Sequence, residues 1–583
     1  MRNLLLAGSI LALAVPAHAD ANGDLVTLVN DVWAASLKEQ PVYASALGVN
    51  DYASELGDYT LAAQDRRAAD AAKFLARLNA IPSGSLNAAS KVEAGILRRA
   101  LNSTIEGNSF GQRAINFTTY SSWHQQLAGM AQNLPFRTKA DFESYNARLA
   151  QYARVNDENI AVANVAIKGK YTQPCVTLKG FEGTISGLIT TDVNRSRFYE
   201  PYATKRPAGV SEADFASLAK AAEATIRTVI HPALNKQLAW YTASYKPACA
   251  TAPGVSAQPG GAKYYAFRVR EETTTSLTAE QIHQIGLNEV ARIRAEMVEV
   301  ASKAGYPSRE AFIQHLRTDP QYYAKTPEEL MEKVARVTKI IDGKMPSLFG
   351  RLPRLPYGIK EIPAETAEGT TTAYYNQGSP EIGISGTYFV NTSKLNQRPF
   401  WEIPALSVHE GVPGHHHQIA LQQELPLSDF RKYGAFFTAF TEGWGLYSER
   451  LGIEMGLYDT PAKDMGRLSY EMWRACRLVV DTGIHAKGWS KQQAIDFMTD
   501  NSALSAANIE AEVNRYISWP GQALAYKLGE LKIRELRTMA TKELGPKFNL
   551  AAFHDAVLGQ GSVPLDVLEQ QITDWVAAEK AKG

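Results

Sequence analysis

Apolar residues recur every three to four positions through most of this 583-residue chain, and that spacing limits its fold more than any other feature. The clearest stretch begins at Thr278, which forms a capping-box pattern with Gln281, and its apolar face continues to Val300. Gly305 and Pro307 then predict the end of the helix. The same periodicity appears in the segments 65–101, 138–167, 212–241 and 326–341. We therefore expect a mainly α-helical protein.

Sequence typical of strands is scarce. The best candidates are Tyr264 to Val269 and Ile382 to Val390. A stretch rich in Pro and Gly, Lys246 to Gly261, predicts a long connection. We place a boundary there, which divides the chain into an N-terminal helical region of residues 20–260 and a second region of residues 261–583.

The first nineteen residues have the pattern of a signal peptide. Arg2 gives a positive start, Leu4 to Val15 are apolar, and Ala17-His18-Ala19 fits the rule for cleavage after Ala19. No later segment has the roughly 18 uncharged apolar residues of a membrane span. We expect an exported, periplasmic protein without stable membrane insertion, and no Cys lies near the cleavage point to carry a lipid.

The charges of the chain nearly cancel, with 61 Lys and Arg against 60 Asp and Glu. This balance leaves no basic excess to neutralise phosphate groups. Nucleic acid is therefore not an expected partner.

Three cysteines remain for structural roles. Cys175 and Cys249 both lie in loop-like sequence beside Pro, so we expect them to pair in an oxidising compartment. Cys476 lies in a helical pattern and is expected to be a small buried side chain.

The segment His409 to His417 holds four of the eleven histidines of the chain. The apolar residues Trp401 to Val408 before it predict a buried helix, which would carry these imidazoles into the interior. A zinc hydrolase needs neutral imidazole ligands, an open coordination position and a carboxylate that takes a proton from water. His409 and the adjacent Glu410 supply one ligand and that base. The alternatives are a surface cluster that binds metals adventitiously and a helix N-terminus with satisfied polar side chains.

The second ligand cannot lie one turn after the first, because Pro413 stands where a His-Glu-x-x-His motif has its second His. On a regular helix His415 would point about 240° away from His409. Pro413 and Gly414 predict a break that lets His415 turn back towards the metal. His416 would be in phase with His409 but about 10 Å further along, so it is held in reserve.

A third ligand is expected from the next helix. Glu442 follows His409 by 33 residues, which leaves room for a second helix to return, and aromatic neighbours argue against a solvated position. Glu449, two turns later, is expected to accept a hydrogen bond from a ligand imidazole. The alternative for either acid is a solvated helix face.

The chain resembles the bacterial exported proteins grouped as domain of unknown function 885, which are similar to the gluzincin class of metallopeptidases. The resemblance covers roughly residues 110 to 575 and rests on five segments: His409 to His416, Glu442-Gly443-Trp444-Gly445-Leu446-Tyr447, Asp481 to His485, Arg515-Tyr516 with Pro520 to Ala523, and Thr278 to Met297.

This resemblance implies a large, mainly α-helical zinc peptidase with a few short strands beside the active-site helix. It implies one Zn²⁺ ion held by the region of His409 and His415 and by Glu442, with Glu410 as general base. Residues 261–583 would then be the metal-binding catalytic region. Known gluzincins have the uninterrupted five-residue motif, which this chain lacks.

Two further residues of the motifs are candidates for stabilising an oxyanion. Attack on a peptide carbonyl creates negative charge, and a nearby His or Tyr donor stabilises it by about 2.7–4 kcal/mol in comparable sites. We expect His485 and Tyr516 in this role, with a structural histidine as the alternative for His485. Tyr526 is a weaker candidate for contact with substrate.

Arg474 and Arg477, three residues apart on a predicted helix, are candidates for substrate binding. Together they would hold a substrate carboxylate in bidentate fashion. Each is equally expected to pair with Asp481 or Glu471 instead.

Gly383 to Thr392 lies about twenty residues before the metal helix and has strand-like sequence. Metallopeptidases commonly bind an extended substrate along a sheet edge, so we expect this segment to be such an edge. Its alternative is an ordinary structural hairpin.

These features predict a zinc-dependent hydrolase of peptide bonds that acts on short peptides as an exo- or oligopeptidase. A two-His-one-carboxylate iron site is an alternative, but it leaves Glu410 without a role. The other alternative is an inactive metal- or peptide-binding protein. The sequence gives no oligomeric state.

Overall fold

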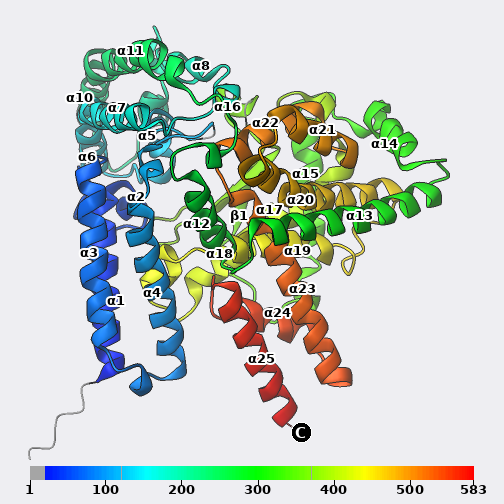
Figure 1. Ribbon diagram of the computed structural model, residues 1–583. Coiled ribbons are helices and arrows are strands. Elements are labelled where there is room, and N and C mark those ends of the chain that lie inside the picture. Colours follow the sequence, from blue (N-terminus) through cyan, green and yellow to red (C-terminus); the bar gives the residue numbers. More distant parts are fainter. Residues whose placement is uncertain (1–19, 120, 369, 583) are drawn as a thin grey trace, which may run out of the picture.

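The computed structural model describes residues 20–119, 121–368 and 370–582, so the expected signal peptide lies outside the described residues. The described chain is mainly α-helical, as predicted, with a small three-stranded sheet near its middle (Figure 1). Among these residues, no helix combines the length and apolar character needed to cross a bilayer.

The N-terminal part contains two groups of helices (Figure 1). The long helices α1, α3 and α4 share one hydrophobic core with α19 and α23–α25 of the C-terminal part, whereas α5–α11 have a core of their own. The boundary placed near residue 260 stays a prediction. The helices of this part are α1 (Ala21–Glu39), α2 (Pro41–Ala46), α3 (Leu61–Ala80), α4 (Ala88–Asn108), α5 (Trp123–Gly129), α6 (Lys139–Ala150), α7 (Tyr152–Gly169), α8 (Phe181–Ser186), α9 (Glu200–Ala203), α10 (Glu212–Thr225) and α11 (His231–Trp240).

The remaining elements surround the histidine segment. A third core joins α13, α14 and α15 to α17, α20, α21 and α22. The helices are α12 (Gly261–Thr273), α13 (Ala279–Lys303), α14 (Arg309–Thr318), α15 (Pro327–Asp342), α16 (Ala364–Ala367), α17 (Ile403–Glu410), α18 (His415–Glu424), α19 (Thr438–Leu451), α20 (Pro461–Lys487), α21 (Lys491–Asn501), α22 (Ala506–Ser518), α23 (Ala525–Leu544), α24 (Leu550–Leu558) and α25 (Leu565–Ala581), and the strands are β1 (Tyr357–Glu361), β2 (Ala373–Asn376) and β3 (Gly386–Val390).

The small sheet has the strand order β1-β3-β2, with β1 parallel and β2 antiparallel to β3. Tyr388 at the centre of β3 is paired with Ile359 on one side and Tyr375 on the other. The expectation that Gly383 to Thr392 forms a sheet edge is therefore wrong, because both sides of β3 are already hydrogen-bonded. The outer strands are β1 and β2.

Helix boundaries follow local sequence signals in most places. The capping box of Thr278 and Gln281 is confirmed at the start of α13, and Thr326 caps α15, in which Pro327 is the first residue. The predicted disulfide between Cys175 and Cys249 is confirmed, and Cys476 is buried.

The expected strand Tyr264 to Val269 is wrong, because this segment lies in α12. Tyr265, Phe267 and Val269 alternate in the sequence, yet all three are buried on the helix. A helix that is buried on several sides loses the one-sided apolar pattern by which a helix is recognised.

Candidate metal centre

The histidine segment forms two helices joined by a tight break. α17 ends at Glu410 and α18 begins at His415. The amide of Gly414 donates to the carbonyl of Val408 (2.9 Å), and a Cβ on Gly414 would lie 1.9 Å from the carbonyl oxygen of His409. Only glycine allows the chain to approach its own helix end this closely. The break predicted from Pro413 and Gly414 is therefore present, and it turns His415 back towards His409.

α19 packs against this break and supplies the acids. The indole of Trp444 donates to the carbonyl oxygen of Pro413 (2.7 Å), which fixes the break to α19. A Cβ on Gly445 would lie 2.7 Å from the ring of His409, so glycine is required where this imidazole lies against the helix. Glu442 and Glu449 are seven residues apart and face the same side of α19.

Three donor groups converge here. The Oε2 atom of Glu442 lies 3.5 Å from Nε2 of His409 and 3.3 Å from Nε2 of His415, and the two imidazole rings are 4.6 Å apart. Within the described residues, these three side chains form the one group of His, Cys, Asp or Glu ligands with atoms all within 4.8 Å. The buried Oε2 atom has no hydrogen-bond partner in the described chain.

The spacing of these atoms suits a tetrahedral ion. Donors that lie about 2.0–2.2 Å from zinc at tetrahedral angles are separated from one another by about 3.4 Å. Two imidazole nitrogens and one carboxylate oxygen also match the ligand set of catalytic zinc sites that keep a fourth position open. The residues present therefore fit a zinc ion.

The electrostatics of the cluster favour a cation. Burial alone would raise the pKa of Glu442, but the adjacent imidazoles of His415 and His409 hold it well below its ordinary value. Burial lowers the pKa of His409, but Glu442 and Glu449 outweigh this effect and raise it to about 9. The two acids therefore stabilise a positive charge on His409. A metal ion bound at the same place would be stabilised by the same acids, and His409 would lose its proton on binding.

Glu449 orients the first imidazole, as expected. The Nδ1 atom of His409 donates to Oε1 of Glu449 (2.8 Å), which leaves Nε2 directed at Glu442. The carboxylate of Glu449 is also paired with Arg474 at 3.0 Å.

Glu410 lies beside the cluster without joining it. The residue is 7% exposed, and its side chain makes no hydrogen bond to the described part of the chain. Burial raises its pKa, an effect that His409 and His415 oppose. A carboxylate with a raised pKa and free oxygens is suited to proton transfer.

His416, the reserve ligand, points away from the cluster. Its Nδ1 atom lies 3.0 Å from the hydroxyl of Tyr375 and its Nε2 atom 2.9 Å from the carbonyl oxygen of Leu355. With both nitrogens engaged, His416 connects α18 to the sheet, and His415 faces the cluster.

The structure does not bring His485 into this group. Its Nδ1 atom accepts from the amide of Val255 (3.0 Å) and its Nε2 atom donates to the carbonyl oxygen of Tyr516 (2.9 Å). The hydroxyl of Tyr516 accepts from Trp473 (2.8 Å) and Arg477 (2.9 Å). This geometry disfavours the oxyanion role expected for both residues. Both ring nitrogens of His485 are bonded to backbone groups. The hydroxyl of Tyr516 accepts from Trp473 and Arg477 and is also bonded to the carboxylate of Glu512, away from the cluster.

The two arginines form buried ion pairs rather than an open clamp. Arg474 pairs with Glu449, and Arg477 pairs with Glu512 at 2.9 Å, so neither of the expected partners Asp481 and Glu471 is used. Both arginines are at most 3% exposed, which disfavours a contact with substrate carboxylate.

Tyr526, which sequence reasoning rated weakly, lies nearer to the cluster. Its ring is parallel to that of His409 within 16° at a centroid distance of 6.5 Å, and the guanidinium of Arg477 covers it at 4.1 Å. Its hydroxyl accepts hydrogen bonds from the side chains of Arg515 (2.8 Å) and Gln522 (3.4 Å). Arg515 and Gln522 belong to a motif that the sequence analysis named. The sequence alone did not indicate that both residues donate hydrogen bonds to Tyr526.

Comparisons with known proteins agree with this arrangement of elements. Residues 41–572 match the family model described as "Bacterial protein of unknown function (DUF885)". A "putative lipoprotein" from Colwellia psychrerythraea is similar over 96% of this chain and 100% of its own, with 28% identity and a TM-score of 0.87. A second "putative lipoprotein of unknown function", from Shewanella oneidensis, covers 95% and 100% of the two chains with 19% identity and a TM-score of 0.71. No curated protein matches. The family model spans nearly the whole chain, which therefore belongs to the DUF885 family of bacterial proteins.

Proposed function

We propose that this protein is a zinc-dependent hydrolase of peptide bonds. The observation that carries the proposal is the geometry around Oε2 of Glu442. This buried oxygen lies close to Nε2 of both His409 and His415 and has no hydrogen-bond partner in the described chain. This carboxylate faces only two imidazoles, at 3.3 and 3.5 Å, and a bound cation would compensate its charge more fully. When bound, zinc would polarise the scissile carbonyl and lower the pKa of an attacking water.

Glu410 is the general base in this proposal. Its carboxylate, adjacent to the ligands and free of hydrogen bonds in the described chain, takes a proton from the attacking water. The raised pKa produced by burial makes the carboxylate a stronger base for this step, and the proton then passes to the leaving amine, which is the more basic group. Glu449 keeps the imidazole of His409 in the orientation that ligation requires, and Arg474 balances the charge of Glu449.

Tyr526 is the oxyanion donor in this proposal, in place of His485 and Tyr516. Its hydroxyl accepts from Arg515, so its own proton is available to a different acceptor. Burial raises the pKa of this phenol, and the positive charges of Arg515 and Arg477 beside it oppose that rise. A donor of this kind is worth about 10²–10³-fold in turnover.

Short peptides are the proposed substrates, cleaved by exo- or oligopeptidase action in the periplasm. Support for export comes from the signal-peptide pattern and from the description of each of the two similar proteins named above as a "putative lipoprotein". This chain has cysteines at positions 175, 249 and 476, and the first two form a disulfide, which suits an oxidising compartment.

A peptide digest with matched variants tests the proposal. Purified protein loaded with zinc is incubated with a defined peptide mixture, with and without chelator, and products are read by mass spectrometry. Glu410→Gln should retain zinc and lose turnover by about 10³-fold or more. Glu402→Gln is the matched control, because Glu402 is a buried glutamate at the other end of α17.

Three outcomes would contradict the proposal. Absence of any cleavage despite bound zinc would indicate a binding protein. Selective retention of iron with oxygen-dependent chemistry would indicate an iron site with the same ligands. Full turnover by Glu410→Gln would remove the general base from the mechanism.

A further inference from the structure

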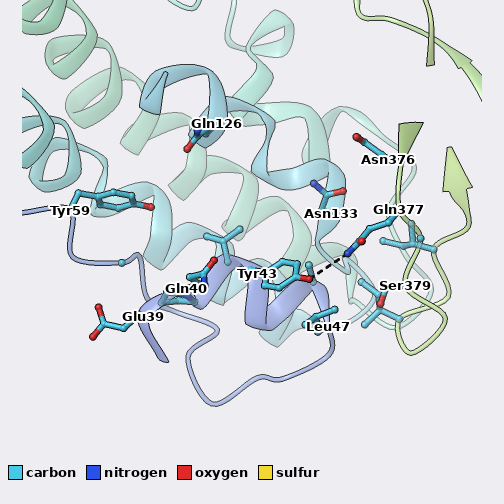
Figure 2. A pocket seen from close by; sticks show the side chains of 17 residues that line it. Glu39, Gln40, Tyr43, Leu47, Tyr59, Gln126, Asn133, Asn376, Gln377 and Ser379 are labelled. Carbon is cyan, nitrogen blue, oxygen red and sulfur yellow. Dashed lines mark hydrogen bonds between the residues drawn. The ribbon is translucent and has the colours of Figure 1, made fainter. Parts of the chain in front are cut away.

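A cavity of about 480 Å³ lies between the N-terminal helices and the edge of the sheet. One wall is formed by α2 and by the loop that contains Tyr59, and the opposite wall by the residues that follow β2 (Figure 2). Asn133, in the turn after α5, and Asn376, at the end of β2, belong to opposite parts of the chain and both line the cavity. No sequence motif pointed to this place.

Two contacts, one of them fully buried, connect the wall of the cavity to the helix that carries His415. The side chain of Gln423 on α18 donates to the carbonyl oxygen of Gly378 (3.1 Å), a residue of the cavity wall. One residue before Asn376, the hydroxyl of Tyr375 lies 3.0 Å from His416. The same helix therefore positions the metal cluster and this wall.

The separation of the two sites suits an extended substrate. His415 and Gln423 are eight residues apart on α18, or about 12 Å along its axis. An extended peptide covers that distance in about three to four residues. β2 is an outer strand of the sheet and leads directly into the cavity wall, so a strand edge that could pair with an extended peptide adjoins the cavity.

The lining contains five amide side chains among six apolar residues, and it has a single acid. Asn133 and Asn376 have no side-chain hydrogen bonds within the described residues, so each offers a donor and an acceptor to a ligand. In Figure 2, Tyr59 lies at the end of the cavity opposite to Asn376. The one acid of the lining, Glu39, is neutralised by Arg66 at 3.3 Å and Arg67 at 3.0 Å. Such a site matches a neutral ligand with hydroxyl and amide groups and provides no counter-charge for an ionic one.

The cavity is also larger than a single side chain requires, since a volume of this size accommodates a small-molecule ligand. We propose that it is a remote substrate subsite, which holds an uncharged group bearing hydroxyls and amides about three to four residues from the scissile bond. This inference rests on the proposed peptidase function. The group is either a run of Asn and Gln side chains or an N-acetyl sugar attached to the peptide.

Matched peptides and variants test the subsite. One short peptide that the enzyme cleaves is extended at either end by Asn and Gln residues, by a residue that carries N-acetylglucosamine, by Ala or by Glu. The double variant Asn133→Ala with Asn376→Ala is compared with Gln132→Ala, an exposed amide next to the cavity that does not line it. Thermal unfolding verifies that all variants are folded.

We expect the wild type to prefer a polar, neutral extension, and the double variant to lose about tenfold in kcat/KM on that substrate alone. The short peptide and the Ala-extended peptide should be cleaved equally by wild type, double variant and Gln132→Ala. Whether the Asn-Gln or the N-acetylglucosamine extension gains more identifies the source of the group.

Binding separates failure of the subsite from failure of the peptidase. Calorimetry with the Asn-Gln peptide and the N-acetylglucosamine peptide is performed on the wild-type chain and on the double variant. Weaker binding by the double variant supports the subsite, even if no peptide is ever cleaved. Equal binding, or an equal loss of kcat/KM on the short and the extended peptides, overturns it.

Discussion

Two clusters of polar side chains in the C-terminal part of this protein contain histidine, one around His485 and one around His409 and His415. They differ in how many of their polar atoms have hydrogen-bond partners. Around His485, each ring nitrogen has one backbone partner, and the adjacent hydroxyl of Tyr516 accepts two hydrogen bonds. In the other cluster, the imidazoles of His409 and His415 both face Oε2 of Glu442, and this oxygen has no hydrogen-bond partner in the described chain.

The comparison shows that burial and motif membership do not distinguish a site from a core. Both clusters are largely buried, although the side chain of Glu442 is 19% exposed, and both lie in the segments that carry the family resemblance. What differs is the remaining capacity to bind something. A saturated cluster stabilises the fold, whereas an unsaturated one costs stability unless a ligand completes it.

Replacing a histidine of the unsaturated cluster should have the largest effect. His415→Ala removes one ligand, so we expect loss of stoichiometric zinc and a fall in turnover of at least about 10³-fold. His416→Ala removes contacts to Tyr375, Leu355 and Tyr357, which lie outside the cluster, and should retain zinc. Metal analysis after dialysis, with peptide cleavage in parallel, measures both effects. Zinc loss in His416→Ala with retention in His415→Ala would reverse the assignment of the second ligand.

The two tyrosines near the clusters provide the next comparison. Tyr526→Phe should lower kcat by about 10²–10³-fold at unchanged zinc affinity, because a donor to the developing oxyanion is lost. Tyr516→Phe should leave kcat unchanged and reduce the free energy of unfolding by about 1–3 kcal/mol, since Trp473 and Arg477 lose their acceptor. Steady-state kinetics and urea unfolding of both variants decide the matter, and a fall in kcat confined to Tyr516→Phe would restore the role predicted from sequence.

Most of the helical architecture was predictable, because its signals are local. Capping residues such as Thr278 and Thr326 act within a single turn, and apolar periodicity marks a helix that is buried on one side. The prediction was wrong for α12, because a helix buried on several sides does not show a single apolar face. The central position of β3 in the sheet could not be predicted either, because strand order depends on partners that are distant in sequence.

The candidate metal cluster was predictable where closeness in the sequence limits the geometry. Pro413 and Gly414 determine the break, and the separation of seven residues places Glu442 and Glu449 on one face of α19. The partners of Arg474, Arg477 and Tyr526 were not predictable, because each comes from packing between helices that are remote in sequence.

A variant in the saturated cluster should affect stability alone. His485→Ala leaves the amide of Val255 and the carbonyl of Tyr516 without partners in the interior, so we expect the free energy of unfolding to fall by about 1–3 kcal/mol. Zinc content and kcat of the folded variant should not change. His315→Ala serves as control, because that side chain is 35% exposed and its loss should cost less than about 0.5 kcal/mol. Urea unfolding measures the difference, and a loss of turnover without a loss of stability would argue for a catalytic His485.

A buried acid outside both clusters should leave turnover unchanged and affect only the dependence of stability on pH. Burial raises the pKa of Glu402 from an ordinary 4.5 to about 8, although Arg398 and Arg317 oppose this effect. Between these pH values the unfolded chain releases the proton and the folded chain retains it, so the free energy of unfolding falls as pH rises. One such group contributes a slope of up to about 1.4 kcal/mol per pH unit. Glu402→Gln cannot ionise, so its stability should decline less than that of the wild type between pH 5 and pH 8 in urea titrations. Parallel declines in the two proteins would mean that Glu402 is already ionised in the folded state.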